Sequence, residues 1–172
     1  MRVAFVAFAI VLAAAGVAGP GETATAPQVH IASLKELPTP LPYPYDEAAD
    51  ANAQVAAAFA RARVNGKRVL IDLGGNWCAD CRILDAVMDL PEMRPFMAAH
   101  YEMVSVDVGR FNKNLQIPAR WGLGKLDKGV PTIIIADADG HAVNISNAAD
   151  LENARAMTPQ GIADWFARWA KP

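Results

Sequence analysis

The chain has 172 residues, of which 53% are hydrophobic, and its sixteen lysines and arginines are balanced by eighteen aspartates and glutamates, for a formal net charge of −2. A chain of this length and hydrophobic content can bury a core, so we expect a single domain. The basic residues form no stripe that would follow a phosphate backbone. Nucleic acid is therefore not an expected partner.

The first residues have the pattern of an export signal. Arg2 is followed by an apolar run at residues 3–17, and small residues at 16–18 suit a signal peptidase. We therefore predict a signal peptide at residues 1–18. The run is shorter than the roughly 20 residues that span a bilayer, so an uncleaved membrane anchor is the alternative. The mature protein is expected to be soluble in the periplasm or another exported, oxidising compartment.

Residues 19–45 are rich in proline, with a spaced series at Pro38, Pro40, Pro42 and Pro44. Proline fixes its own backbone torsion and lacks the amide donor that a helix needs. The segment is therefore interpreted as an extended arm or linker that precedes the domain.

Residues 46–172 contain alternating helix and strand patterns. The first half predicts a helix from 46 to a stop at 65–66, a strand at 68–73, a helix from 78 interrupted at 91, a helical piece at 92–99 and a strand at 101–108. The second half predicts a short helix within 112–121, a strand at 132–136, a turn at 137–140, a strand at 141–146 and a helix capped by Thr158. This order predicts an α/β fold in which helices cover a central, partly parallel sheet.

The chain has two cysteines, Cys78 and Cys81. A disulfide between them would close a very short loop and stabilise the fold little, so reactivity explains the pair better. Cys78 lies at the start of a predicted helix, where backbone dipoles favour a thiolate. We therefore expect Cys78 to be the nucleophile and Cys81, one turn further, to resolve the mixed disulfide.

Three landmarks in order resemble the thioredoxin superfamily. They are the apolar strand with an acid at 69–73, the WCADC segment at 77–81 and the GVPT segment at 129–132. The likeness covers residues 46–171. It implies a thioredoxin fold, with a central mixed sheet flanked by helices and a C-terminal β-hairpin followed by a helix.

The resemblance also implies roles for individual residues. Asp72 is similar to the family's buried acid, which takes and returns the proton of the second cysteine. Pro131 resembles the cis-proline packed against the disulfide, where the Val130 backbone is free to pair with an extended substrate. Trp77 resembles the tryptophan that shields the rim of the site. The residues alone leave other readings open: Asp72 facing solvent, Pro131 in trans, and Trp77 in ordinary packing.

The chain departs from the common thioredoxin pattern at several positions. Ala79 and Asp80 lie between the cysteines, Met103 replaces a frequent lysine, and residues 122–128 form an extra loop expected beside the site. Loops at the rim of a site choose partners. Asp80 places a negative charge near Cys78, which is expected to disfavour the thiolate and make the pair a reductase or electron relay.

The favoured hypothesis is a thiol:disulfide oxidoreductase that acts on protein thiols and disulfides through Cys78 and Cys81. It is expected to be a monomer without bound cofactor or metal, and a membrane thiol-reductant conduit is a candidate electron donor. The alternative is a periplasmic Cu(I)-binding module that uses the same soft thiolates. A third hypothesis is an interaction domain without catalysis.

Overall fold

The computed structural model describes residues 24–171, so the predicted signal peptide at 1–18 lies outside the described residues. Its sheet has three strands in the order β2-β1-β3. The central strand β1 (Arg68–Gly74) is parallel to β2 (Tyr101–Asp107) and antiparallel to β3 (Thr132–Ala136). This mixed sheet confirms the predicted thioredoxin fold.

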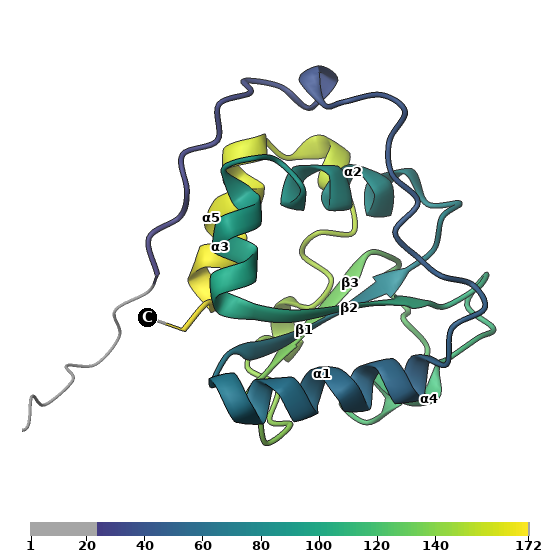
Figure 1. Cartoon of the computed structure of the whole chain (residues 1–172). Helices are drawn as coiled ribbons and strands as arrows, with labels where there is room; N and C mark the ends of the chain where they lie inside the picture. Colours follow the sequence, from purple (N-terminus) through teal and green to yellow (C-terminus); the bar gives the residue numbers. More distant parts are fainter. Residues whose placement is uncertain (1–23, 172) are drawn as a thin grey trace, which may run out of the picture.

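Helices cover both faces of the sheet (Figure 1). Helix α1 (Ala51–Asn65) lies below it, while α2 (Ala79–Met88), α3 (Met93–His100) and α5 (Pro159–Trp169) lie above it. A one-turn helix, α4 (Gln116–Ala119), precedes β3. Three short 3-10 helices complete the described secondary structure, at Leu34–Glu36, Ile145–Asn147 and Ala154–Ala156.

The ends of the helices follow from capping residues. The Asp50 carboxylate accepts a hydrogen bond from the amide of Ala53 at the start of α1. Gly66 ends this helix in the left-handed conformation, with a φ of 75°. Thr158 caps α5 as predicted, and Pro159 occupies the first turn, where no amide donor is needed.

Side chains of the sheet alternate between two cores. Leu70 and Ile133 pack above the sheet against α2, α3 and α5. Val69 and Ile71 pack below it with α1. Both faces of β1 are covered, and Leu70 and Ile71 are fully buried. The central strand is therefore a rigid base for the groups at its C-terminal end.

The proline-rich segment packs along the domain (Figure 1). Val29 and Leu37 are buried in the upper core. The Arg82 guanidinium donates hydrogen bonds to the carbonyls of Leu41 and Pro42, at 2.7 and 2.8 Å. Over residues 24–45 the chain is thus an extended arm that apolar side chains and backbone carbonyls bind to the domain.

The predicted hairpin strand at 141–146 is also corrected. After the turn at 137–140, only Ala142 forms a bridge with Ala136. The buried Asn144 side chain then takes the place of a strand. It accepts from the amide of Ile135 and donates to the carbonyl of Ile133, both at 2.8 Å. A side-chain amide thus satisfies the edge of β3, and the chain turns into a 3-10 helix.

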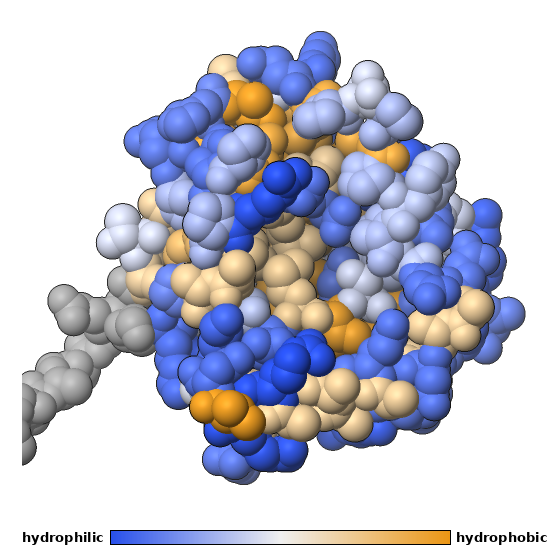
Figure 2. Space-filling view, viewed as in Figure 1, coloured by the Kyte–Doolittle hydropathy of each residue, from blue (hydrophilic) through white to orange (hydrophobic). Residues whose placement is uncertain are grey.

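The face of the molecule in Figure 2 is largely covered by hydrophilic residues, with smaller hydrophobic spots between them. Among residues 24–171, no helix has both the length and the apolar character that crossing a membrane requires.

Candidate functional site

Cys78 and Cys81 lie at the start of α2, just after the turn that follows β1. Cys78 is the N-cap of α2, and its Sγ accepts a hydrogen bond from the amide of Cys81 at 3.2 Å. Both side chains are free thiols; Cys78 is 6% exposed, and Cys81 is fully buried. The arrangement gives an incoming disulfide access to Cys78 before Cys81.

The two thiols differ in acidity. Hydrogen bonding with Cys81 lowers the pKa of Cys78 to about 7, and the amide of Asp80 adds to this effect, although burial opposes it. The same hydrogen bond, together with burial, raises the pKa of Cys81 well above its usual value. Near neutral pH, Cys78 is partly a thiolate while Cys81 keeps its proton.

Asp72 lies in the middle of β1 and is only 1% exposed. Burial raises its pKa to about 8, although a hydrogen bond from Tyr45 opposes the shift. Its carboxyl group lies within electrostatic reach of both cysteines: the charge of Cys78 helps to raise the pKa of Asp72, and the charge of Asp72 helps to raise the pKa of Cys81. A carboxyl that titrates near physiological pH can exchange protons with a neighbouring group.

Tyr45, at the end of the proline-rich segment, completes the buried side of the site. Its hydroxyl donates to both carboxyl oxygens of Asp72, at 2.9 Å each, and its side chain is buried. Gly74 leaves room for this contact, since a Cβ there would lie 2.3 Å from the Tyr45 hydroxyl and 2.7 Å from Cys81 Sγ. The sequence around Tyr45 gave no prediction of this role.

The loop before β3 lies opposite the nucleophile. The Cys78 thiol donates a hydrogen bond to the Val130 carbonyl at 3.4 Å. The Val130–Pro131 peptide bond is cis, and Pro131 is buried. The structure therefore brings together Cys78, Cys81, Asp72, Val130 and Pro131, all of which the sequence had singled out.

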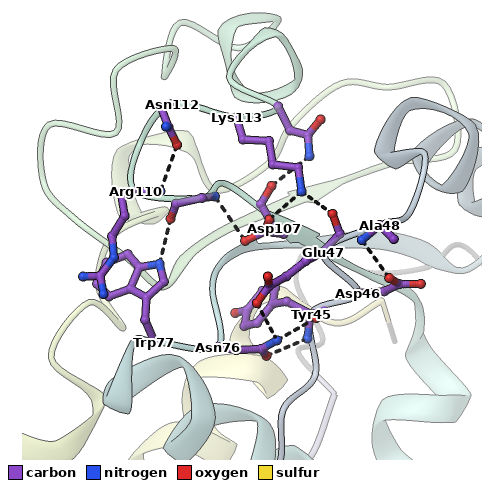
Figure 3. A network of polar contacts seen from close by, with 12 residues as sticks. Tyr45, Asp46, Glu47, Ala48, Asn76, Trp77, Asp107, Arg110, Asn112 and Lys113 are labelled. Carbon is purple, nitrogen blue, oxygen red and sulfur yellow. Dashed lines mark hydrogen bonds and ion pairs between the residues drawn. The ribbon is translucent and has the colours of Figure 1, made fainter.

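Trp77 lies at the rim and is 39% exposed. Its indole Nε1 donates to the Gly109 carbonyl at 2.7 Å (Figure 3). The Arg110 guanidinium stacks over the ring at 4.4 Å, and the Phe111 ring meets it edge-on at 5.8 Å. Trp77 is thus held against a neighbouring loop and not in the core.

Asp80 is a buried anion with a charged partner. Its side chain is 7% exposed and pairs with Arg155, whose guanidinium Nε donates to both carboxylate oxygens at 2.9 and 3.0 Å. The amide of Arg155 donates to the same carboxylate at 2.9 Å. Burial opposes the charge of Asp80, but Arg155 outweighs it and lowers the pKa of Asp80. The charge of Asp80 still acts to raise the pKa of Cys78, as expected, but the hydrogen bonds from Cys81 and from the Asp80 amide outweigh it, and the pKa of Cys78 is lowered overall.

The extra loop at 122–128 lines a pocket of about 370 Å³ together with Thr132 and Ile145. Thr132 directly follows Pro131, so the pocket adjoins the chain segment opposite Cys78. Among residues 24–171, no group of three or more His, Cys, Asp or Glu side chains is placed to hold a metal ion. The two thiols are therefore the soft ligands that this site offers.

Comparison with known proteins agrees with this geometry. A family profile described as thioredoxin-like matches residues 50–138. The crystal structure of a disulphide isomerase from Xylella fastidiosa Temecula1 is 38% identical, with a TM-score of 0.69 over 74% of this chain and 97% of that chain. The oxidised C-terminal domain of Neisseria meningitidis DsbD is 23% identical, with a TM-score of 0.42 over 55% of this chain and 80% of that chain. None of the curated proteins matches. With half of its length in the profile and a solved relative of this similarity, the chain belongs to the thioredoxin-like family.

Proposed function

We propose that the chain is an exported thiol:disulfide oxidoreductase that exchanges its Cys78–Cys81 pair with protein substrates, as a reductase or electron relay. The observation that carries the proposal is the unequal acidity of the two thiols, with the pKa of Cys78 lowered to about 7 and that of Cys81 raised. Disulfide exchange needs a nucleophile that ionises near neutral pH and a second thiol that reacts later.

The reaction has two displacements. The Cys78 thiolate attacks a substrate disulfide, forms a mixed disulfide and releases the first substrate sulfur as a thiolate. Cys81 then loses its proton and attacks Cys78 Sγ, which releases the second substrate sulfur. The substrate gains two electrons, and the chain is left with a Cys78–Cys81 disulfide.

The acidity of Cys78 supports the reducing direction. Thioredoxin has a nucleophile with a pKa near 7, whereas a strongly oxidising exported relative has one near 3.5. Cys78, with a pKa of about 7, belongs with the former. A reductase in an oxidising compartment needs an electron donor, and we propose a membrane thiol-reductant conduit for that role.

Two further observations support the choice of substrate. The similar Xylella protein is described as a disulphide isomerase. The exposed Trp77 precedes Cys78 in the chain, and the Val130 carbonyl contacts the Cys78 thiol, so both lie beside the sulfur that a substrate must reach. We propose that Val130 and Pro131 position the substrate backbone and that Trp77 contacts it from the rim.

The order of attack provides the test. Cys81→Ser should accumulate mixed disulfides with unfolded protein substrates, visible on non-reducing gels, and Cys78→Ser should trap none. The unmodified protein should reduce insulin when dithiothreitol is supplied. Equal trapping by both variants, or trapping by Cys78→Ser alone, would show that the nucleophile is misassigned.

Titration with Cu(I) tests the alternative use of the same sulfur atoms. The proposal expects disulfide exchange to proceed in the presence of a copper chelator. Tight Cu(I) binding by a protein that reduces no insulin would replace the proposed function by metal carriage.

A further inference from the structure

We infer that Tyr45 is a positioning residue of this reaction, whose hydroxyl joins the Cys81 thiol to the Asp72 carboxyl and carries the proton between them. The inference rests on the proposed function, because a proton must leave Cys81 only if Cys81 attacks the mixed disulfide.

The Tyr45 hydroxyl lies beside both groups. It donates to Asp72 Oδ1 and Oδ2, both at 2.9 Å. On its other side, Cys81 Sγ borders the same small space, since a Cβ on Gly74 would lie within 3 Å of both atoms. The charge of Cys81 and a side-chain hydrogen bond with it are among the causes that raise the pKa of Tyr45. The hydroxyl therefore lies between the donor and the acceptor of the proton.

Two sets of contacts hold the segment that carries Tyr45. The Asn76 side chain accepts from the amide of Tyr45 at 3.1 Å and donates to its carbonyl at 2.8 Å (Figure 3). Arg82, the residue after Cys81, binds the carbonyls of Leu41 and Pro42. Asn76 and Arg82 lie on either side of the cysteine pair in sequence, so the turn and helix that carry the thiols also fix Tyr45.

The chemistry balances without any further group. When Cys81 attacks Cys78 Sγ, its proton passes to the Tyr45 oxygen while the Tyr45 hydroxyl proton passes to the Asp72 carboxylate. Tyr45 is neutral before and after the step. Burial and the charge of Asp72 raise the pKa of Tyr45 well above its usual value, so it does not ionise on its own. The reverse transfer returns the proton when the disulfide is reduced.

Stopped-flow reaction with 5,5′-dithiobis(2-nitrobenzoate) separates the two displacements. The first thionitrobenzoate is released when Cys78 attacks, and the second when Cys81 resolves the mixed disulfide. Tyr45→Phe should leave the first phase unchanged and slow the second by roughly a hundredfold or more. In the unmodified protein the second phase should rise to a plateau with a midpoint near the Asp72 pKa of about 8. The variant should lose this plateau, because Cys81 then gives its proton to solvent.

The other two tyrosines of the chain provide matched controls. Tyr43 lies in the same segment but is 66% exposed, so Tyr43→Phe should change neither phase. Tyr101 is buried, and its hydroxyl donates to the Phe166 carbonyl at 2.6 Å. Tyr101→Phe should lower stability but leave both phases and their pH dependence intact, which separates loss of a buried hydroxyl from loss of the bridge.

The pKa of Asp72 provides a second test that does not depend on reaction rates. Because the hydrogen bond from Tyr45 lowers the pKa of Asp72, carbon-detected NMR of Tyr45→Phe should show that pKa raised. If this variant does not fold, a solvent deuterium isotope effect confined to the second phase of the unmodified protein takes its place as the expected result.

Three results would overturn the inference. They are an unchanged second phase in folded Tyr45→Phe, an unchanged Asp72 pKa, and a second phase without an isotope effect when that substitute measurement is used. If the unmodified protein exchanges disulfides but Tyr45→Phe matches it, only the bridge is wrong. A protein that exchanges no disulfides would overturn the proposed function and the bridge with it.

Discussion

Arg155 pairs with Asp80, the charged residue between the two cysteines, and makes no hydrogen bond to either sulfur. Its side chain is 60% exposed, so replacing it should disturb the fold little. In Arg155→Gln the Asp80 carboxylate, which is 7% exposed, would lose its charged partner while remaining beside the thiol. The charge of Asp80 already acts to raise the pKa of Cys78, and the substitution would leave that effect unopposed.

The expected size follows from Coulomb's law. A full charge at 4 Å costs a second like charge about 1 kcal/mol in bulk water and about 4 kcal/mol at an effective dielectric constant near 20. Cys78 is 6% exposed, whereas the Arg155 side chain that pairs with Asp80 is 60% exposed, so the interaction lies between these two limits, and about 1.4 kcal/mol, or one pKa unit, is a reasonable magnitude. The pKa of Cys78 should then rise from about 7 to about 8. The thiolate fraction at pH 7 should fall from about one half to about one tenth.

The reduction potential should fall with it, because the reduced form loses thiolate stabilisation. The loss depends on the ionised fraction, so it should be only about 8 mV at pH 7 and about 20 mV at pH 8. Iodoacetamide alkylation of Cys78 against pH gives the pKa, and equilibration with glutathione gives the potential.

Three further variants complete the test. Asp80→Asn leaves Arg155 without its carboxylate and should lower the pKa of Cys78, and the double variant should return it near the original value. Arg94→Gln is the control, because Arg94 makes a similar two-bond pair with Asp89, at 2.6 and 2.8 Å, in α3. A Cys78 pKa that is unchanged or lower in Arg155→Gln would refute the electrostatic reasoning.

Three more outcomes are expected. Asp72 stays protonated in the folded state up to pH about 8 but ionises near pH 4 when unfolded, so it costs stability increasingly as pH rises between these values. Asp72→Asn should therefore stabilise the fold by roughly 5 kcal/mol at pH 8 and little at pH 4 in urea titrations, while slowing resolution by Cys81; a pH-independent difference would contradict this. Arg82→Met should lower the free energy of unfolding by about 1 to 3 kcal/mol and make residues 38–45 more sensitive to limited proteolysis. Unchanged cleavage would argue that the Arg82 hydrogen bonds do not hold this segment. Asn144→Ala should cost about 2 to 4 kcal/mol in thermal unfolding, because two buried backbone groups lose their partner; a loss below about 0.5 kcal/mol would show that water replaces it.

The parts of the site that could be predicted are encoded locally. A short apolar strand, two glycines and a cysteine at a helix start all lie within residues 68–81, and their pattern was sufficient to place Cys78 at the cap of α2. The burial of Asp72 follows in the same way from its apolar neighbours in β1. Strand β3 and helix α5 were predicted for similar reasons, because continuous apolar runs and capping residues are local signals.

The parts that were missed depend on contacts between distant segments. Tyr45 meets Asp72 across 27 residues, and Arg155 meets Asp80 across 75 residues. No spacing rule connects these positions, and a lone tyrosine after a proline-rich run carries no signal of its own. The sequence correctly places the negative charge of Asp80 near Cys78, but the pairing of that charge with Arg155 follows only from the tertiary structure. The strand predicted at 141–146 was wrong for the same reason. The Asn144 side chain makes the hydrogen bonds to β3 that a strand backbone would make, and the sequence does not reveal this contact.

The family profile covers residues 50–138 and leaves out two residues that contact the site. Residues 50–138 contain both cysteines, Asp72 and the Val130–Pro131 segment, while Tyr45 precedes this span and Arg155 follows it. Two relatives can therefore share the entire recognised span and still differ in the acidity of the first thiol and the proton route of the second. Substitutions at Tyr45 and Arg155 alone could therefore change how the same two cysteines react, without any change in the profile span.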